Sequence, residues 1–162
     1  MKRWDHRPFE IKSLFNPAFC GLILYRAMQA YEDVDSDGMP FSLALLVLPL
    51  CLHKDTREII AANPRSYLLK IVNGHPQILI NFAQRARDLM PYTLEALGFL
   101  MERGCFSVSE NGCLKSISET VRKTISGSDE TKACQRVARL IGKEFAHIDD
   151  RATIYTTFGV RP

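Results

Sequence analysis

The chain has 162 residues, enough for one domain with a hydrophobic core of its own. Hydrophobic residues make up 46% of it and charged residues 24%, ordinary globular values that argue against intrinsic disorder. The formal net charge of +3 is lower than that of most dedicated nucleic-acid binders, so charge alone points to no class of partner.

The sequence offers no targeting or cross-linking signal. Residues 1–15 mix charged and single apolar residues, so we expect no signal peptide. The longest apolar run, residues 41–52, contains Ser42 and Pro49 and is too short to span a bilayer. The five cysteines are irregularly spaced and lack a Cys-x-x-Cys pair, which favours reduced thiols over disulfides or zinc. A soluble, cytoplasmic protein is the prediction.

The first clear element is a helix over residues 16–33. Asn16 is a strong N-cap, and Pro17 suits the first helical position because its missing N–H is not needed there. Its apolar face is broad, which indicates contacts on more than one side. The acidic residues after it lack the spacing of an EF-hand calcium loop, so we expect a solvated turn.

Several helices are predicted between residues 41 and 104. Residues 41–53 form a buried helix that ends or kinks near Pro49, and short helices follow over residues 54–62 and 66–72. Residues 76–89 form an amphipathic helix, and Pro91 starts a separate helix that runs to Arg103 and ends at Gly104.

Residues 105–116 carry the signature of a β-hairpin, with short β-type runs on either side of Asn111-Gly112. The predicted elements, helices followed by a hairpin, come in the order found in a winged-helix unit. We therefore predict a mainly α protein with a small β-hairpin. A single domain, residues 1–162, would hold a winged-helix-like core over 41–116, a helix before it at 16–33 and further helices over 128–162.

The last helices begin at Ser128, a predicted cap, and at Arg151. Four basic residues recur at i, i+4, i+7 and i+11 on one face of the Ser128 helix. Such a stripe is usually a solvated helix surface. A contact with DNA phosphates or with an acidic protein surface is the alternative for these residues, which are Lys132, Arg136, Arg139 and Lys143.

Motifs for catalysis are missing from the sequence. We find neither a nucleophile elbow nor a glycine-rich phosphate loop, and the histidines have no partners at metal-ligand spacing. His53 with Asp55 and Arg57 is the one cluster that resembles a site. Its simpler interpretation is a structural histidine at a helix end, bonded to the backbone. We predict no catalytic residue, no cofactor and no metal; a small hydrolase using His53 and Asp55 is a rival hypothesis.

The winged-helix interpretation raises DNA binding as a further rival, in the form of a transcriptional regulator. In such a unit the helix before the hairpin enters the major groove and needs basic or amide side chains. Here that helix carries Glu95, Glu102 and Arg103, a sum of −1. The segment is better suited to packing against protein.

Four segments together resemble the middle component of prokaryotic three-component ABC systems, the group that includes the small subunit of Lamassu-type defence systems. They are N-P-A-F-C-G-L-I-L-Y-R from Asn16, L-V-L-P-L-C-L-H-K-D-T-R from Leu46, F-A-Q-R-A-R-D-L-M-P-Y-T-L-E-A-L from Phe82, and the terminal F-G-V-R-P. The resemblance runs from about Asn16 to the carboxyl terminus.

The resemblance implies a non-enzymatic adaptor. Such a protein would link an SMC-like ABC ATPase to an effector, commonly a nuclease, in defence against phages or plasmids. DNA contact would be secondary and mainly through the complex. Because two segments have more apolar width than one core needs, we place the docking surface there. The residues of this hypothesis are Asn16, Pro17, Leu48, Pro49, Leu50, His53, Thr56 and Arg57.

Overall fold

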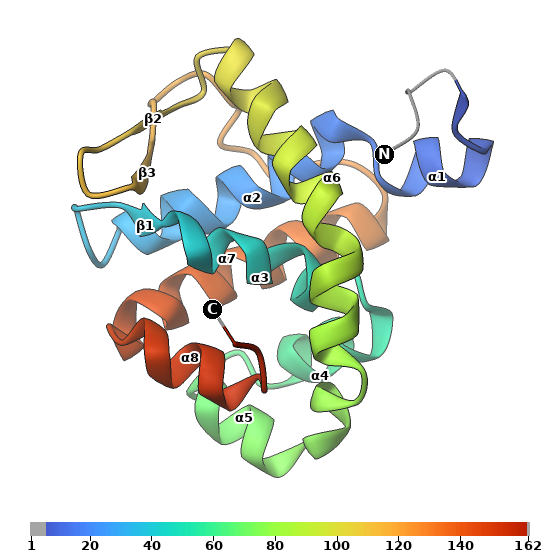
Figure 1. Ribbon diagram of the computed structural model, residues 1–162, viewed down its shortest axis with the longest axis vertical. Coiled ribbons are helices and arrows are strands. Elements are labelled where there is room, and N and C mark those ends of the chain that lie inside the picture. Colours follow the sequence, from blue (N-terminus) through green and yellow to red (C-terminus); the bar gives the residue numbers. More distant parts are fainter. Residues whose placement is uncertain (1–5, 162) are drawn as a thin grey trace.

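The computed structural model describes residues 6–161 and shows a mainly helical fold with one small antiparallel sheet (Figure 1). The predicted fold class, mainly α with a small β-hairpin, is confirmed. In chain order the elements are α1 (Phe9–Leu14), α2 (Pro17–Glu32), β1 (Met39–Pro40), α3 (Phe41–Cys51), α4 (Lys54–Ala62), α5 (Leu68–Gly74), the 3-10 helix η2 (Pro76–Leu79), α6 (Phe82–Glu102), β2 (Phe106–Val108), β3 (Cys113–Ser116), α7 (Asp129–Ile148) and α8 (Arg151–Thr157).

Helix α2 lies at the centre of the fold, with α7 and α6 packed against it (Figure 1). Its broad apolar face is explained by these two neighbours, which bury most of the helix. The approach to α7 is very close at Gly142, where a Cβ atom would overlap the carbonyl oxygen of Ala27. A residue without a side chain therefore sets the distance between the two helices.

The predicted caps form as expected. Asn16 Oδ1 accepts a hydrogen bond from the Ala18 N–H at 2.8 Å, and Pro17 occupies the first turn of α2. Ser128 Oγ accepts from the Thr131 N–H at 3.2 Å at the start of α7. Each cap satisfies a backbone donor that the helix itself leaves free.

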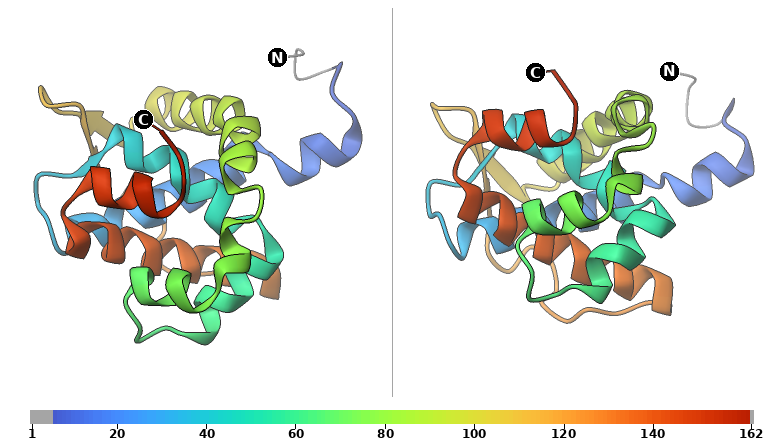
Figure 2. Two further views of the ribbon diagram at one scale, coloured as in Figure 1. Left: turned by 60° about the horizontal axis from the view of Figure 1, so that its bottom comes forward. Right: turned by 90° about the horizontal axis from the view of Figure 1, so that it is seen from below.

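The two helices predicted on either side of Pro91 are instead one continuous helix, α6, so the predicted boundary is wrong. A proline inside a helix removes one backbone hydrogen bond and crowds the preceding turn. Pro91 and Arg87, whose carbonyl loses its partner, are both exposed, so water can satisfy that group. Helix α6 changes direction along its length (Figure 2), and its predicted first turn is the separate helix η2.

The sheet has the order β1-β3-β2, and all its pairs are antiparallel. The predicted hairpin pairs Val108 with Leu114 and closes through a turn in which the Gly112 N–H donates to Ser109 O. Cys113 lies opposite Ser109. Strand β1, which pairs Met39 with Leu114, was not predicted.

Strand β1 joins the hairpin from outside residues 41–116, the range predicted for the winged-helix-like core. The winged-helix interpretation and the single-domain division stay predictions. The five cysteines are free thiols. Within residues 6–161, no helix combines the length and hydropathy that a membrane span requires.

Candidate partner-binding surfaces

Five of the eight predicted docking residues are buried, Arg57 among them. Leu48, Pro49 and Leu50 are buried in α3, within the hydrophobic core, and Thr56 is buried in α4. The apolar side chains of α3 pack against three helices of the same chain, α2, α6 and α7. These four side chains therefore offer no surface to a partner, and any docking surface in this region must use their exposed neighbours.

Arg57 is 5% exposed and bonds within the chain. Its Nη1 donates to Cys51 O at 3.0 Å and to Leu52 O at 3.3 Å, two carbonyls at the end of α3. Its Nη2 pairs with Glu130 Oε1 at 2.8 Å, in the first turn of α7. Arg57 thus connects three helices, a structural role that the sequence did not indicate.

His53 is the N-cap of α4. Its Nδ1 accepts from the Thr56 N–H at 3.3 Å and lies 2.9 Å from Thr56 Oγ1. Burial lowers the pKa of His53, and the nearby Arg85 and Arg57 act in the same direction against Asp55. Because Nδ1 is occupied and no bond to Asp55 is found among the described residues, the geometry favours the structural role over the hydrolase hypothesis.

Phe15 and Phe19, which flank Asn16 and Pro17 in the chain, line a hollow of about 330 Å³, which we call the amino-terminal hollow. It is formed where α1, α2, α3 and α7 meet, and Arg57 is one of its walls. Its other lining residues are Ser13, Leu14, Phe15, Phe19, Leu52, Glu130, Thr131 and Cys134. Of the eight predicted docking residues, Arg57 is the one found in this lining.

Helix α1 stands away from the helical body beside this hollow (Figure 2) and contains no buried residue. Contacts hold it at both ends: Arg7 makes a two-pronged ion pair with Glu95 at 2.7 Å, and Phe15 stacks on Tyr92 at 4.4 Å between ring centres. Phe9 is 79% exposed and Leu14 is 60% exposed. Large apolar side chains presented in this way are typical of a surface that a partner covers.

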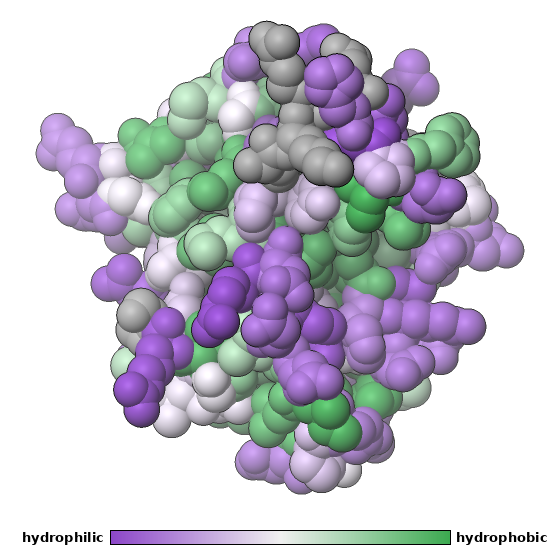
Figure 3. Space-filling view, turned by 45° about the vertical axis from the view of Figure 1, so that its right-hand side comes forward, coloured by the Kyte–Doolittle hydropathy of each residue, from purple (hydrophilic) through white to green (hydrophobic). Residues whose placement is uncertain are grey.

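A second apolar hollow, of about 550 Å³, lies between α3, α6 and the segment after α8; we call it the α6 groove. Its lining residues are Leu45, Leu46, Ala83, Ala86, Arg87, Met90, Tyr155, Gly159, Val160 and Arg161. Apolar side chains continue along α6 beyond it, because Met90, Leu94 and Met101 are 40%, 47% and 55% exposed. Figure 3 shows this side of the molecule, where groups of apolar side chains are separated by a band of hydrophilic ones.

The four basic residues predicted to share a face do line α7, opposite its buried Cys134 and Ile141. Lys132 is close to Asp129, at 3.5 Å. Arg139 also borders a small hollow of about 250 Å³ with Arg26, Gln29, Asp33 and Lys123. Burial and the positive charge of Arg139 lower the pKa of Arg26, which shows that like charges converge there. Contact of this surface with phosphates stays a prediction.

The family of the chain follows from comparison with known proteins. The family model described as ABC-three component (ABC-3C) system Middle Component 3 matches residues 4–162. The chain belongs to this family. The resemblance seen in the sequence is thereby confirmed, and the protein is a middle component of an ABC-three component system. Neither a curated protein nor a solved structure matches the chain.

Sequence reasoning missed the α6 groove of this middle component. The amphipathic helix predicted over residues 76–89 has Phe82 and Ala86 buried, whereas Ala83 and the next residue after that helix, Met90, are exposed. The i, i+4, i+11 spacing of Met90, Leu94 and Met101 was the available signal. It could not be distinguished from core spacing without knowing that α3 and α2 cover the other side of the helix.

Proposed function

We propose that this middle component is a cytoplasmic, non-catalytic adaptor that holds an effector nuclease on an SMC-like ABC ATPase, in a Lamassu-type system against phages or plasmids. One observation supports it most directly. A small chain exposes two apolar hollows, the amino-terminal hollow and the α6 groove, which share no lining residue. A protein that bridges two partners needs two such surfaces, whereas a protein that binds one partner needs only one.

The α6 groove has the character of a helix-binding groove. Leucine, methionine and valine side chains line its floor. Arg87 and Arg161 also line it, and its lining residues within 6–161 include no carboxylate. An amphipathic helix that carries acidic residues beside its apolar face would match both the floor and the charge. We assign this groove to one of the two neighbouring components.

The amino-terminal hollow would take the other component. Phe9 and Leu14 project from α1 next to an apolar wall made by Phe15, Phe19 and Leu52. Full burial of an exposed Phe or Leu side chain contributes about 1.5–3 kcal/mol. Two such residues, with the wall behind them, could anchor a stable interface.

The non-catalytic part of the proposal is supported by the positions of the polar residues. His53 caps α4, and Arg57 and Glu130 pair with each other across α4 and α7. Each of these groups therefore has a structural task. In the described part of the chain, no group of three or more His, Cys, Asp or Glu residues is arranged to hold a metal ion.

The experiment compares single substitutions in the two hollows. The chain is co-expressed with the ATPase and effector components of its own system, and the complexes are separated by size-exclusion chromatography and weighed by native mass spectrometry. Met90→Glu places a charge in the α6 groove, and Leu14→Glu places one at the amino-terminal hollow. We expect each variant to lose one neighbour, by at least about tenfold in yield, and to keep the other.

Tyr67→Asp is the matched control, because Tyr67 is 70% exposed on the loop before α5 and outside both hollows. It should keep both neighbours. A wild-type chain that binds neither component contradicts the adaptor role. If Met90→Glu and Leu14→Glu release the same single neighbour, the chain has one extended interface and does not bridge.

A further inference from the structure

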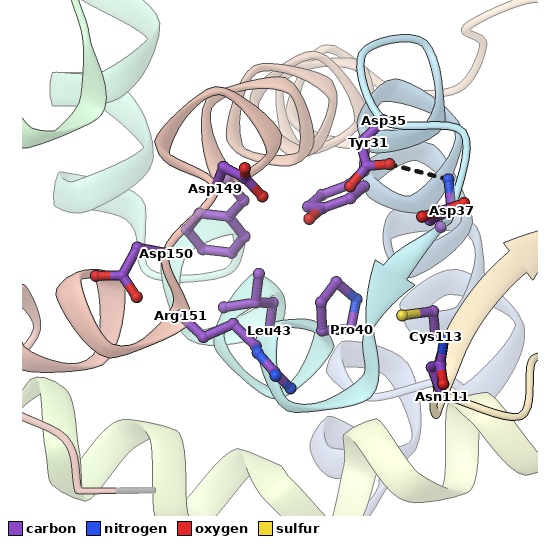
Figure 4. Close-up of a pocket in the computed structure, with 12 residues that line it drawn as sticks. Tyr31, Asp35, Asp37, Pro40, Leu43, Asn111, Cys113, Asp149, Asp150 and Arg151 are labelled. Atoms are coloured by element: carbon purple, nitrogen blue, oxygen red, sulfur yellow. Dashed lines mark hydrogen bonds between the residues drawn. The ribbon is translucent and has the colours of Figure 1, made fainter.

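A third hollow, of about 280 Å³, is acidic and lies on neither proposed docking surface (Figure 4). It forms where the end of α2, the loop before β1, the hairpin turn and the junction of α7 with α8 meet. Tyr31 and Phe145 contribute aromatic walls and Pro40 and Leu43 an apolar floor. The charged and polar lining residues are Asp35, Asp37, Asn111, Cys113, Asp149, Asp150 and Arg151.

The hydroxyl of Tyr31 points into this acidic hollow, toward Asp149 (Figure 4). The residue is only 3% exposed, and its hydroxyl makes no hydrogen bond to the described residues. Among those residues, Arg85 Nε is the one fully enclosed side-chain N or O atom without a partner, so the Tyr31 oxygen is open to the hollow and can bond a ligand there. Burial and the carboxylates of Asp35 and Asp149 raise the pKa of Tyr31 to about 12, so the group stays a neutral phenol.

Two of the four carboxylates are engaged by the chain. Asp150 points away from the hollow (Figure 4) and caps α8, where it accepts from the Ala152 and Thr153 N–H groups at 3.1 Å. One oxygen of Asp35 accepts from the Asp37 N–H at 2.9 Å. Asp37 and Asp149 make no ion pair within residues 6–161. Arg151, which also lines the hollow, offsets part of the negative charge around the Tyr31 hydroxyl, but the carboxylates of Asp35 and Asp149 outweigh it.

The backbone around the hollow is held in place for reasons unrelated to its charge. Gly38 has φ of +92°, and a Cβ there would lie 2.7 Å from Leu114 O, so this glycine lets the acidic turn lie against β3. Asp149 ends α7 in the left-handed region with φ of 51°. Both acidic segments are therefore fixed relative to Tyr31 before any ligand arrives.

We propose that this hollow binds an organic cation with a guanidinium or primary ammonium head. The head would sit between Asp149, Asp37 and the Tyr31 hydroxyl. The hydroxyl oxygen would accept a hydrogen bond from one N–H group of the head. The carbon chain behind it would lie on Pro40 and Leu43, with the rings of Tyr31 and Phe145 available for cation–π contact. The two sources of such a head are a free polyamine and a lysine or arginine side chain of a partner protein.

An organic cation fits these residues better than a metal ion does. Magnesium and calcium need several oxygen ligands that converge at one point. The described residues form no such group, and the walls and floor of this hollow include apolar and aromatic side chains. A wide, mixed site of this kind suits a large cation with an apolar stem.

The first experiment titrates the isolated chain with spermidine and with arginine amide by calorimetry, at constant ionic strength. We expect Tyr31→Phe and Asp149→Asn each to weaken binding by about tenfold, as the loss of a hydrogen bond to a charged group does. Phenylalanine preserves the packing of the ring, and asparagine tolerates a left-handed backbone, so both variants should fold. Asp88→Asn, on α6 with its carboxylate bonded to Gln84, is the control that should bind like wild type.

The second experiment repeats the co-expression with the same variants, and only this arm rests on the adaptor role. Binding of the free amines identifies a polyamine site. Loss of a neighbour in Asp149→Asn and Tyr31→Phe, without binding of free amines, identifies a partner's basic side chain. If Mg²⁺ competes as well as spermidine, or if neither assay responds to the variants, the proposal is overturned. Spermidine binding by a chain that assembles with no neighbour would refute the adaptor role and leave this site standing.

Discussion

At the scale of single residues, His53 illustrates how a structural side chain can resemble a catalytic one in a sequence. Its neighbours Asp55 and Arg57 give it the composition of an active site. In the fold its ring replaces the Ser, Thr, Asp or Asn that usually caps a helix, and it accepts from the Thr56 N–H. Only a neutral ring can do so, because a protonated imidazole has no acceptor.

This cap predicts a pH-dependent stability. The pKa of His53 is lowered by burial in the folded chain, while the unfolded chain titrates near about 6.5. The unfolded state therefore takes up the proton first, so the stabilisation is complete above about pH 6.5 and is lost as pH falls through the lower folded pKa. In wild type, we expect part of the fall in the free energy of unfolding between pH 7 and pH 5 to come from protonation of this cap. His53→Asn, whose side chain caps without titrating, should reduce that fall by about 1 kcal/mol, measured by urea unfolding at the two pH values.

His75→Asn is the control for this experiment and should leave the acid destabilisation unchanged. Identical pH profiles for wild type and His53→Asn would show that the cap does not depend on the protonation state of the ring.

Residue-level predictions succeeded where the cause is local. The caps at Asn16 and Ser128 follow from a side chain and the N–H two or three residues later. The ion pair of Arg57 could not be predicted, because its partner, Glu130, lies far away in the sequence. The local sequence around an arginine does not show whether its guanidinium forms an ion pair within the chain or with another protein.

At the scale of elements, the close approach of α2 and α7 depends on Gly142. Alanine at this position would press its Cβ into the backbone of Ala27, and backbone cannot rotate away as a side chain can. We expect Gly142→Ala to destabilise the chain by about 1–3 kcal/mol, measured from the urea midpoint.

Gly98→Ala is the matched control, since Gly98 lies in α6 with no atom within 4 Å of its would-be Cβ. It should stabilise the chain by up to about 1 kcal/mol, because alanine is the better helix former. Equal effects of the two substitutions would mean that α7 can shift away from α2 at little cost.

Helix α6 marks the limit of element prediction. A proline in a helix interior usually ends it, and that rule placed a boundary at Pro91. The rule fails here because the site is exposed and tertiary contacts hold both halves of α6. Strand β1 was missed for a related reason, since a strand of two residues exists only through its partner β3.

At the scale of the whole molecule, the basic face of α7 makes a separate prediction. Lys132, Arg136, Arg139 and Lys143 stand on the surface, with Arg26 and Lys123 beside Arg139. We expect the complex to retain DNA in a salt-dependent way, and alanine at the four α7 positions to weaken this retention. For each phosphate contact that the variant loses, the slope of log K for DNA binding against log salt concentration should become shallower by about 0.9, measured by fluorescence anisotropy.

The four-alanine variant must still bind its neighbours as wild type does, which tests that the surface does not serve protein docking. Unchanged DNA retention and unchanged assembly would together identify the α7 face as an ordinary solvated surface.

The two hollows that support the adaptor proposal exist only once the chain has folded. Walls of the α6 groove come from α3, α6 and residues 159–161, which are distant in the sequence. Periodicity could predict that a helix has an apolar face, but not whether another part of the same chain covers it. The family resemblance supplied the expectation of partners, and the fold shows where uncovered apolar surface remains.

Cys113 offers a site for chemical labelling in the wall of the acidic hollow. Burial raises the pKa of the Cys20 thiol to about 12 and also raises those of Cys51 and Cys134, so these thiolates form too rarely to react. Cys105 is buried as well, whereas Cys113 is half-exposed in the wall of the hollow. A maleimide dye should therefore label the native chain at Cys113 first. Without any engineered cysteine, the labelling rate would report whether that hollow is empty or filled.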